Sequence, residues 1–81
     1  METNKILEEI TIIFREILDN NEILLTMNST AKDVEEWDSL THVLLIVAIE
    51  KHFKIRFTSI EIQSFLNVGD MCNSIKNKIS N

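Results

Sequence analysis

Three side chains capable of chemistry lie close together in the sequence, namely Asp38, Ser39 and His42. A carboxylate, a hydroxyl and an imidazole are the groups of a hydrolytic triad, and a spacing of three residues places Ser39 and His42 side by side on a helix. The surrounding sequence has no nucleophile elbow, and nothing in it supplies oxyanion donors or a pocket. We therefore expect no catalytic residue here, and we interpret His42 as a partly buried packing residue.

The remaining metal-ligating and nucleophilic residues are equally sparse. His42 and His52 are ten positions apart, about 15 Å along a helix, so they cannot share a metal ion. The chain has no EF-hand loop, HExxH motif or Cys/His cluster. Its one cysteine, Cys72, cannot form an internal disulfide, which fits a reducing compartment. We expect no metal site, and we interpret Cys72 as a packing residue.

Length and composition indicate one small domain over residues 1–81. One glycine and no proline argue against a turn-rich β fold. The longest apolar run, Val43 to Ile49, is too short to span a membrane. The first residues lack the features of a signal peptide. These features predict a cytoplasmic protein without a membrane span, and the abundance of isoleucine, asparagine and lysine suggests a bacterial source.

The charge is negative overall and unevenly distributed. Thirteen acidic and eight basic residues give a net charge of −5. Residues 1–38 carry a net charge of −7, whereas residues 39–81 carry +2. A nucleic-acid backbone repels such a chain, so we expect no nucleic-acid partner. An acidic surface instead favours basic protein partners, although it can also serve solubility alone.

The spacing of apolar residues predicts four helices, because they recur at intervals of three and four. Asp38 and Thr58 are typical residues at helix N-termini. The expected helices cover residues 4–18, 39–53 after Asp38, a short one from 59 to about 66, and 68–79. Residues 21–37 form a long first loop, which we expect Trp37 and its aliphatic neighbours to hold in place. The fold class is thus all-α, a four-helix bundle with three longer helices and one short helix.

The second helix has two apolar stripes where a small domain needs only one. At 100° per residue, one stripe faces a core, and the other lies on the side of Ser39. The second stripe consists of Leu40, Val43, Leu44 and Val47, and we call it the partner face. We expect it to be an exposed partner surface. The alternative is that the long loop folds over it, with Trp37 or Leu24 and Leu25 as the cover.

Ser39 occupies the first helical position after the capping Asp38. A phosphate on its hydroxyl would lie at the positive end of the helix dipole, near unpaired backbone N–H groups. Taken alone, a serine after a capping aspartate is ordinary for a helix start. The residues around Ser39 therefore have to show whether it is a modification site or only part of the helix start.

The segment Glu36-Trp37-Asp38-Ser39-Leu40-Thr41-His42, continued by the apolar residues up to Glu50 and by Phe53 and Ile55, resembles the acyl carrier protein family. The resemblance extends to the helix order and covers nearly the whole chain. It implies an acyl-carrier-like bundle in which Ser39 receives 4′-phosphopantetheine from coenzyme A through a Mg²⁺-dependent phosphopantetheinyl transferase. Acyl or aminoacyl groups would be held on that arm as thioesters.

The resemblance also implies roles for the neighbours of Ser39. Asp38 would cap the helix beside the attachment point. The partner face would contact a loading enzyme and downstream transferases, with Glu36 among the acidic residues that meet basic partners. The protein would be a monomer and not an enzyme.

Three positions depart from carriers of fatty-acid synthesis. Trp37 precedes Asp38, and Thr41 and Leu44 stand where acidic residues are common. This form looks like discrete carriers from surface-polysaccharide, polyketide or nonribosomal-peptide pathways. We therefore expect a specialised biosynthetic pathway, and a housekeeping fatty-acid carrier is one alternative. The other is a noncatalytic helical adaptor that binds a partner through the same face with Ser39 unmodified.

Overall fold

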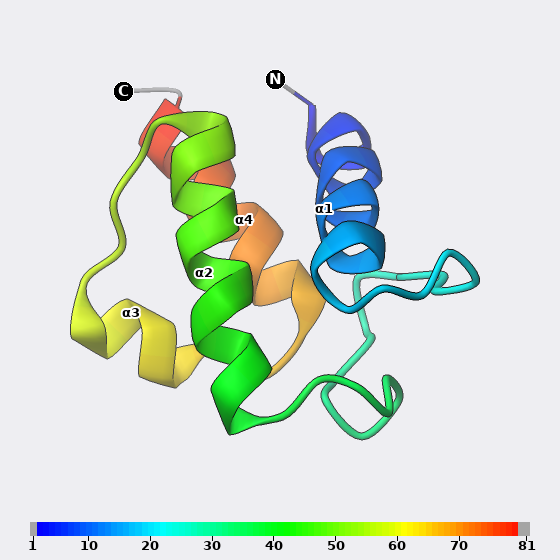
Figure 1. Cartoon of the computed structure of the whole chain (residues 1–81). Helices are drawn as coiled ribbons and strands as arrows, with labels where there is room; N and C mark the ends of the chain where they lie inside the picture. Colours follow the sequence, from blue (N-terminus) through cyan, green and yellow to red (C-terminus); the bar gives the residue numbers. More distant parts are fainter. Residues whose placement is uncertain (1, 80–81) are drawn as a thin grey trace.

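The computed structural model describes residues 2–79, which form four helices and, within that range, no strand. The helices are α1 (Thr3–Ile17), α2 (Ser39–Phe53), α3 (Ser59–Ser64) and α4 (Val68–Ile79). Figure 1 shows α1, α2 and α4 running roughly alongside one another, with the short α3 at the side of α2. The predicted all-α bundle is confirmed, and the helix ends lie within one or two residues of their expected positions.

The core lies between the three long helices. Each of these contributes one apolar stripe, and the stripe of α2 that faces inward contains Leu45, Ile46 and Ile49. The long first loop adds four buried apolar side chains, Ile23, Leu25, Val34 and Trp37. Phe14 from α1 and Trp37 pack edge-to-face, with their ring centroids 5.0 Å apart. The loop is therefore part of the core, as expected from its aliphatic residues and Trp37.

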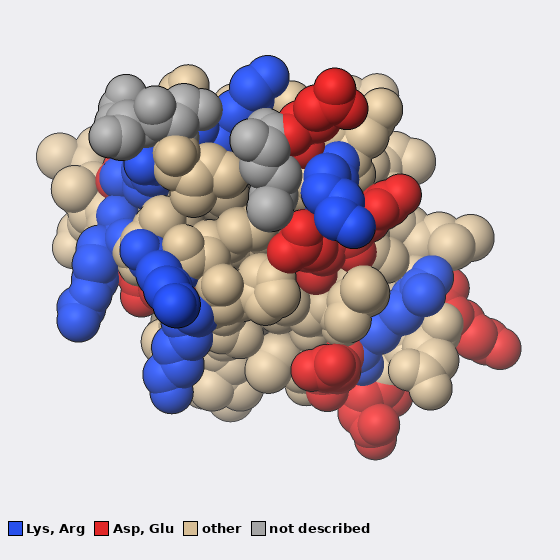
Figure 2. Space-filling view, turned by 90° about the horizontal axis from the view of Figure 1, so that it is seen from above, with Lys and Arg blue, Asp and Glu red and all other residues tan. Residues whose placement is uncertain are grey.

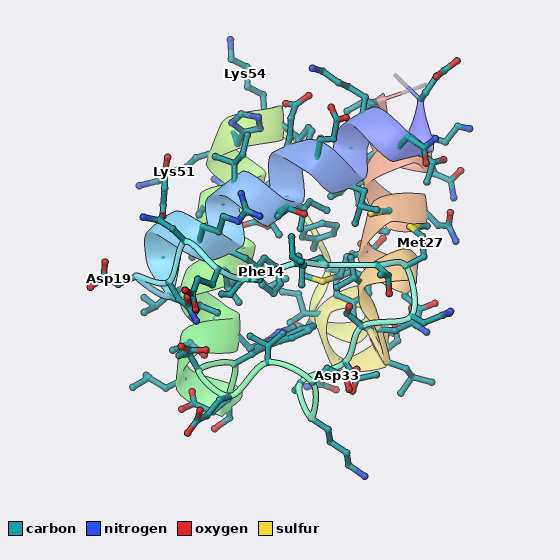
Figure 3. All side chains as sticks on the ribbon, turned by 90° about the vertical axis from the view of Figure 1, so that its right-hand side faces the viewer. Phe14, Asp19, Met27, Asp33, Lys51 and Lys54 are labelled. Atoms are coloured by element: carbon teal, nitrogen blue, oxygen red, sulfur yellow. The ribbon has the colours of Figure 1, made fainter. Side chains whose placement is uncertain are left out.

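The loop is also tied to the start of α4 through its backbone. The N–H of Gly69 donates to the carbonyl of Met27 at 2.7 Å, and the N–H of Val68 donates to that of Ser29 at 2.9 Å. A Cβ atom at Gly69 would lie 2.8 Å from the Met27 carbonyl oxygen. Only glycine permits this approach. Figure 3 shows Met27 beside α4. Our expectation about the loop was thus incomplete, because side-chain packing is not its only anchor.

The short helix α3 has no fully buried residue, although Ile62 packs against the core, and polar contacts also attach it. The predicted capping box is present, since Thr58 accepts from the N–H of Glu61 and Glu61 accepts from that of Thr58. Glu61 also bonds to the Ser74 hydroxyl at 3.1 Å and to Lys78 at 3.0 Å on α4. One carboxylate therefore caps α3 and joins it to α4.

Candidate functional site

Ser39 is the first residue of α2, and its side chain is exposed. Asp38 precedes it as the N-cap: its Oδ1 accepts from the N–H of Leu40 at 3.0 Å and from that of Thr41 at 2.9 Å. Thr41 completes a capping box by accepting from the Asp38 N–H at 2.8 Å. The backbone start of α2 is thereby held rigidly. The Ser39 hydroxyl makes no hydrogen bond within residues 2–79, so it is presented freely to solvent.

These hydrogen bonds also set the charge beside Ser39. The backbone N–H and then the hydroxyl of Thr41, together with the Leu40 N–H, keep the pKa of the Asp38 carboxyl below its ordinary value. Asp38 is therefore ionised at neutral pH. The structure refines our expectation about a phosphate at this site. The N–H groups of Leu40 and Thr41 already donate to Asp38. The neighbouring N–H of Ser39 has no acceptor among the described residues.

His42 links three parts of the site instead of acting as a base for Ser39. Its Nδ1 accepts from the indole N–H of Trp37 at 3.0 Å, and its Nε2 faces the Ile62 carbonyl at 3.5 Å. The rings of Trp37 and His42 stack with their centroids 6.0 Å apart. His42 is half-buried, as expected, but its contacts are polar as well as apolar. With both ring nitrogens engaged, the triad-like trio of residues 38, 39 and 42 has no hydrolytic geometry.

A groove of about 360 Å³ opens beside Ser39. The loop, α2 and α3 each supply part of its wall, and its lining is more apolar than polar. Sequence reasoning missed the wall residues outside α2 and Trp37, which are Ala31, Ile62, Gln63, Phe65 and Leu66. The one available signal was the apolar Leu66, which lies just beyond the short helix and is highly exposed. An extended group attached to Ser39 would have this groove as its nearest surface.

The second apolar stripe of α2 is open to solvent. The exposed fractions are 72% for Leu40, 56% for Val43, 51% for Leu44 and 42% for Val47. The alternative in which the loop covers this stripe is wrong. Trp37 and Leu25 are buried in the core on the other side, and Leu24 is itself 80% exposed. A row of exposed aliphatic side chains on one helix is typical of a protein-binding face.

Glu36 lies at the same end of the molecule as Ser39, although part of its bonding capacity is used internally. Its carboxylate accepts from the Asn20 side-chain amide at 2.9 Å, and its carbonyl accepts from the Thr41 hydroxyl at 2.9 Å. Asp33 and Glu35 nearby in the loop are exposed. Acidic side chains are therefore grouped in the loop that leads to Ser39, and Asp33 and Glu36 both accept internal hydrogen bonds.

The other sequence candidates lie away from this site. Cys72 is buried, and burial raises the pKa of its thiol to about 11, so it packs rather than reacts. Within residues 2–79, no three His, Cys, Asp or Glu side chains are grouped so that they could hold a metal ion. No described helix is long and apolar enough to cross a membrane.

Comparison with known proteins agrees with this geometry. The chain matches no protein-family model. Among solved structures, it is similar to the holo acyl carrier protein of Geobacter metallireducens, with 42% sequence identity, a TM-score of 0.86, and coverage of 91% of this chain and 85% of that one. It is also similar to a protein from Mycobacterium tuberculosis described as an acyl carrier protein, with 28% identity, a TM-score of 0.79, and coverage of 89% and 96%. The level of identity over nearly the whole length shows that this chain belongs to the acyl carrier protein family, whose members are noncatalytic carriers rather than enzymes.

Proposed function

We propose that Ser39 carries a 4′-phosphopantetheine arm and that the protein delivers acyl or aminoacyl groups to partner enzymes. Members of the acyl carrier protein family carry such a prosthetic group in general. The observation that carries the assignment to Ser39 is its exposed, unbonded hydroxyl at the first position of α2, next to the groove.

The residues of this chain fit the group. The Asp38–Thr41 capping box holds the backbone of Ser39 in one orientation. The positive end of the α2 dipole and the Ser39 N–H favour an attached phosphate, which partly offsets its repulsion by Asp38. The groove walls supply apolar surface for an extended chain. When bound, the arm supplies a terminal thiol that holds acyl groups as thioesters.

The test of this proposal is the intact mass after incubation with coenzyme A, Mg²⁺ and a promiscuous phosphopantetheinyl transferase. We expect a gain of one phosphopantetheine, and we expect the Ser39→Ala variant to show none. Ser59 is a matched control, because it is also an exposed serine at the first position of a capped helix. Ser59→Ala should gain the full mass. A gain that survives Ser39→Ala would contradict the assignment.

We further propose a specialised biosynthetic pathway rather than housekeeping fatty-acid synthesis. The support is the character of the partner face. Glu50 is the one acidic residue of α2, and its carboxylate accepts the Phe57 N–H at 2.8 Å, so the exposed side of α2 is mainly apolar. The comparison to make is the affinity of a housekeeping ketosynthase for this protein and for its own carrier. Equal affinities would contradict a specialised role.

Membership of the acyl carrier protein family also supports proposals for the domain organisation, oligomeric state, location and partners of this protein. The protein would act as a single carrier domain over residues 1–81, as a monomer in the bacterial cytoplasm. Its partners would be the transferase, a loading enzyme and downstream transferases. A noncatalytic adaptor is the second candidate, and the exposed stripe of α2 is the observation in its favour. It would be preferred if Ser39 gains no mass while a control carrier is loaded.

A further inference from the structure

Three basic side chains cluster at the end of α2 that is farthest from Ser39. Lys51, Lys54 and Arg56 are all exposed and line one open hollow of about 600 Å³. Figure 3 shows Lys51 and Lys54 pointing away from the body of the molecule at this end. Within residues 2–79, none of the three forms a salt bridge. We call this cluster the basic end.

No acidic side chain of the described residues lies within salt-bridge distance of the basic end. Glu50 also lines the hollow, but its carboxylate is turned to the backbone N–H of Phe57. His52 is paired with Glu9 of α1. Figure 2, seen from above, shows most Lys and Arg side chains on one side of this face and most Asp and Glu side chains on the other. The basic end therefore carries a local excess of positive charge, with three basic side chains against Glu50 alone at the hollow, although the whole chain is acidic.

The basic end is continuous with the partner face. Val47 belongs to the exposed stripe and also lines the hollow. At 100° per residue, Lys51 projects on the same side of α2 as that stripe, and Lys54 follows directly as the C-cap of the helix. Lys51 lies about 18 Å along the helix axis from Ser39. The face therefore changes along its length from acidic loop residues near Ser39, through aliphatic side chains, to the basic end.

We infer that the enzyme that receives the arm of this protein presents carboxylates to Lys51 and Arg56, with the contact to Lys51 about 18 Å along the α2 axis from the point where it admits Ser39. This inference rests on the proposed carrier function. Charge complementarity of this kind speeds encounter and sets orientation more than it adds affinity per pair. With an apolar centre and opposite charges at its two ends, the face accepts a partner in one direction only.

Two other occupants fit the observations less well. An anionic membrane would attract the basic end but repel Asp33, Glu35 and Asp38 at the other end of the face. A second copy, packed antiparallel, would pair the ends correctly but would cover Ser39 and block delivery of the arm. A protein partner with carboxylates at the basic end satisfies both constraints.

The test uses the full chain in three forms: unchanged, Lys51→Glu/Arg56→Glu, and the matched control Lys5→Glu/Lys76→Glu. Both variants change net charge equally at exposed residues, and the control residues lie on α1 and α4. Each form is first loaded by the transferase with an arm that ends in a thiol-reactive electrophile, and loading is checked by intact mass. A failure of loading would count against the carrier function itself, separately from this inference.

The loaded proteins are then cross-linked in an extract of the organism that encodes the chain, and the captured enzyme is purified for binding measurements. We expect Kd to rise at least tenfold for Lys51→Glu/Arg56→Glu and less than twofold for the control. We also expect the binding of the unchanged chain to weaken with added NaCl more steeply than that of the first variant.

Several outcomes would overturn the inference. These are equal Kd values for the two variants, tighter binding by Lys51→Glu/Arg56→Glu, or no arm-dependent capture in an extract where a control carrier is captured. Binding of the unchanged chain to phosphatidylglycerol vesicles, lost in the first variant, would assign the basic end to a membrane. A concentration-dependent dimer in sedimentation, lost in that variant, would assign it to a second copy.

Discussion

The indole N–H of Trp37 donates to Nδ1 of His42 at 3.0 Å, and this bond joins the end of the long loop to the first turn of α2. Because Nδ1 accepts, the neutral ring carries its proton on Nε2, which faces the Ile62 carbonyl just beyond the middle of α3. One imidazole thus connects the three walls of the groove beside Ser39. The residue that resembles a catalytic histidine in the sequence is a structural link.

Removing the acceptor at His42 should destabilise the protein. In His42→Leu the buried indole N–H of Trp37 loses its partner, which costs about 1–3 kcal/mol. Urea unfolding followed by the fluorescence of Trp37, the one tryptophan, measures the loss. His42→Gln keeps an acceptor and should lose less. Equal losses in the two variants would mean that the hydrogen bond contributes nothing beyond packing.

Gly69→Ala should lower stability although alanine is the better helix former. The added methyl would lie 2.8 Å from the Met27 carbonyl oxygen, a backbone atom that cannot move without shifting the loop. We expect a loss of about 1–3 kcal/mol, typical of overpacking. Asn73→Ala, at an exposed position of α4, should be neutral or slightly stabilising. Thermal unfolding compares the two, and an unchanged midpoint for Gly69→Ala would show that the loop is not anchored at this contact.

Polar substitutions on the exposed stripe of α2 should leave the fold intact. Leu44→Glu and Val47→Glu should each change the free energy of unfolding by no more than about 0.5 kcal/mol. Leu45→Ala, on the buried stripe of the same helix, should cost about 2–5 kcal/mol. Denaturant titration provides the measurement. A strong loss of stability in both glutamate variants would show that the stripe belongs to the core.

The pH dependence of stability should report on Glu61. The backbone N–H of Thr58, then Lys78 and Ser74, lower the pKa of this carboxyl to about 2, from an ordinary value of 4.5. A depressed native pKa stabilises the fold above pH 4.5 and loses that contribution as the pH falls toward 2. The difference in Tm between the unchanged protein and Glu61→Gln should therefore be largest near neutral pH and become smaller below pH 4.5. A difference independent of pH would contradict the assigned pKa.

The helices of this protein could be predicted from its sequence because they depend on interactions between residues close together in the chain. Helix periodicity and capping involve residues within about four positions of one another, so α1, α2 and the Thr58–Glu61 capping box could be expected from local pattern alone. The placement of Ser39 directly after a capping Asp38 is likewise local. The family resemblance added the chemistry that we propose for Ser39, which no periodicity contains.

Contacts between distant residues decided the rest. Both stripes of α2 are apolar, and only the assembly of the core that joins Leu45, Ile46 and Ile49 to residues of α1, α4 and the loop buries one and leaves the other exposed. The groove beside Ser39 and the Met27–Gly69 approach join segments that are far apart in the chain. Such pairings depend on how the helices assemble, because the same local pattern is compatible with several arrangements. The sequence by itself therefore determined the helices and the position of Ser39, and the tertiary structure decided which surface surrounds it.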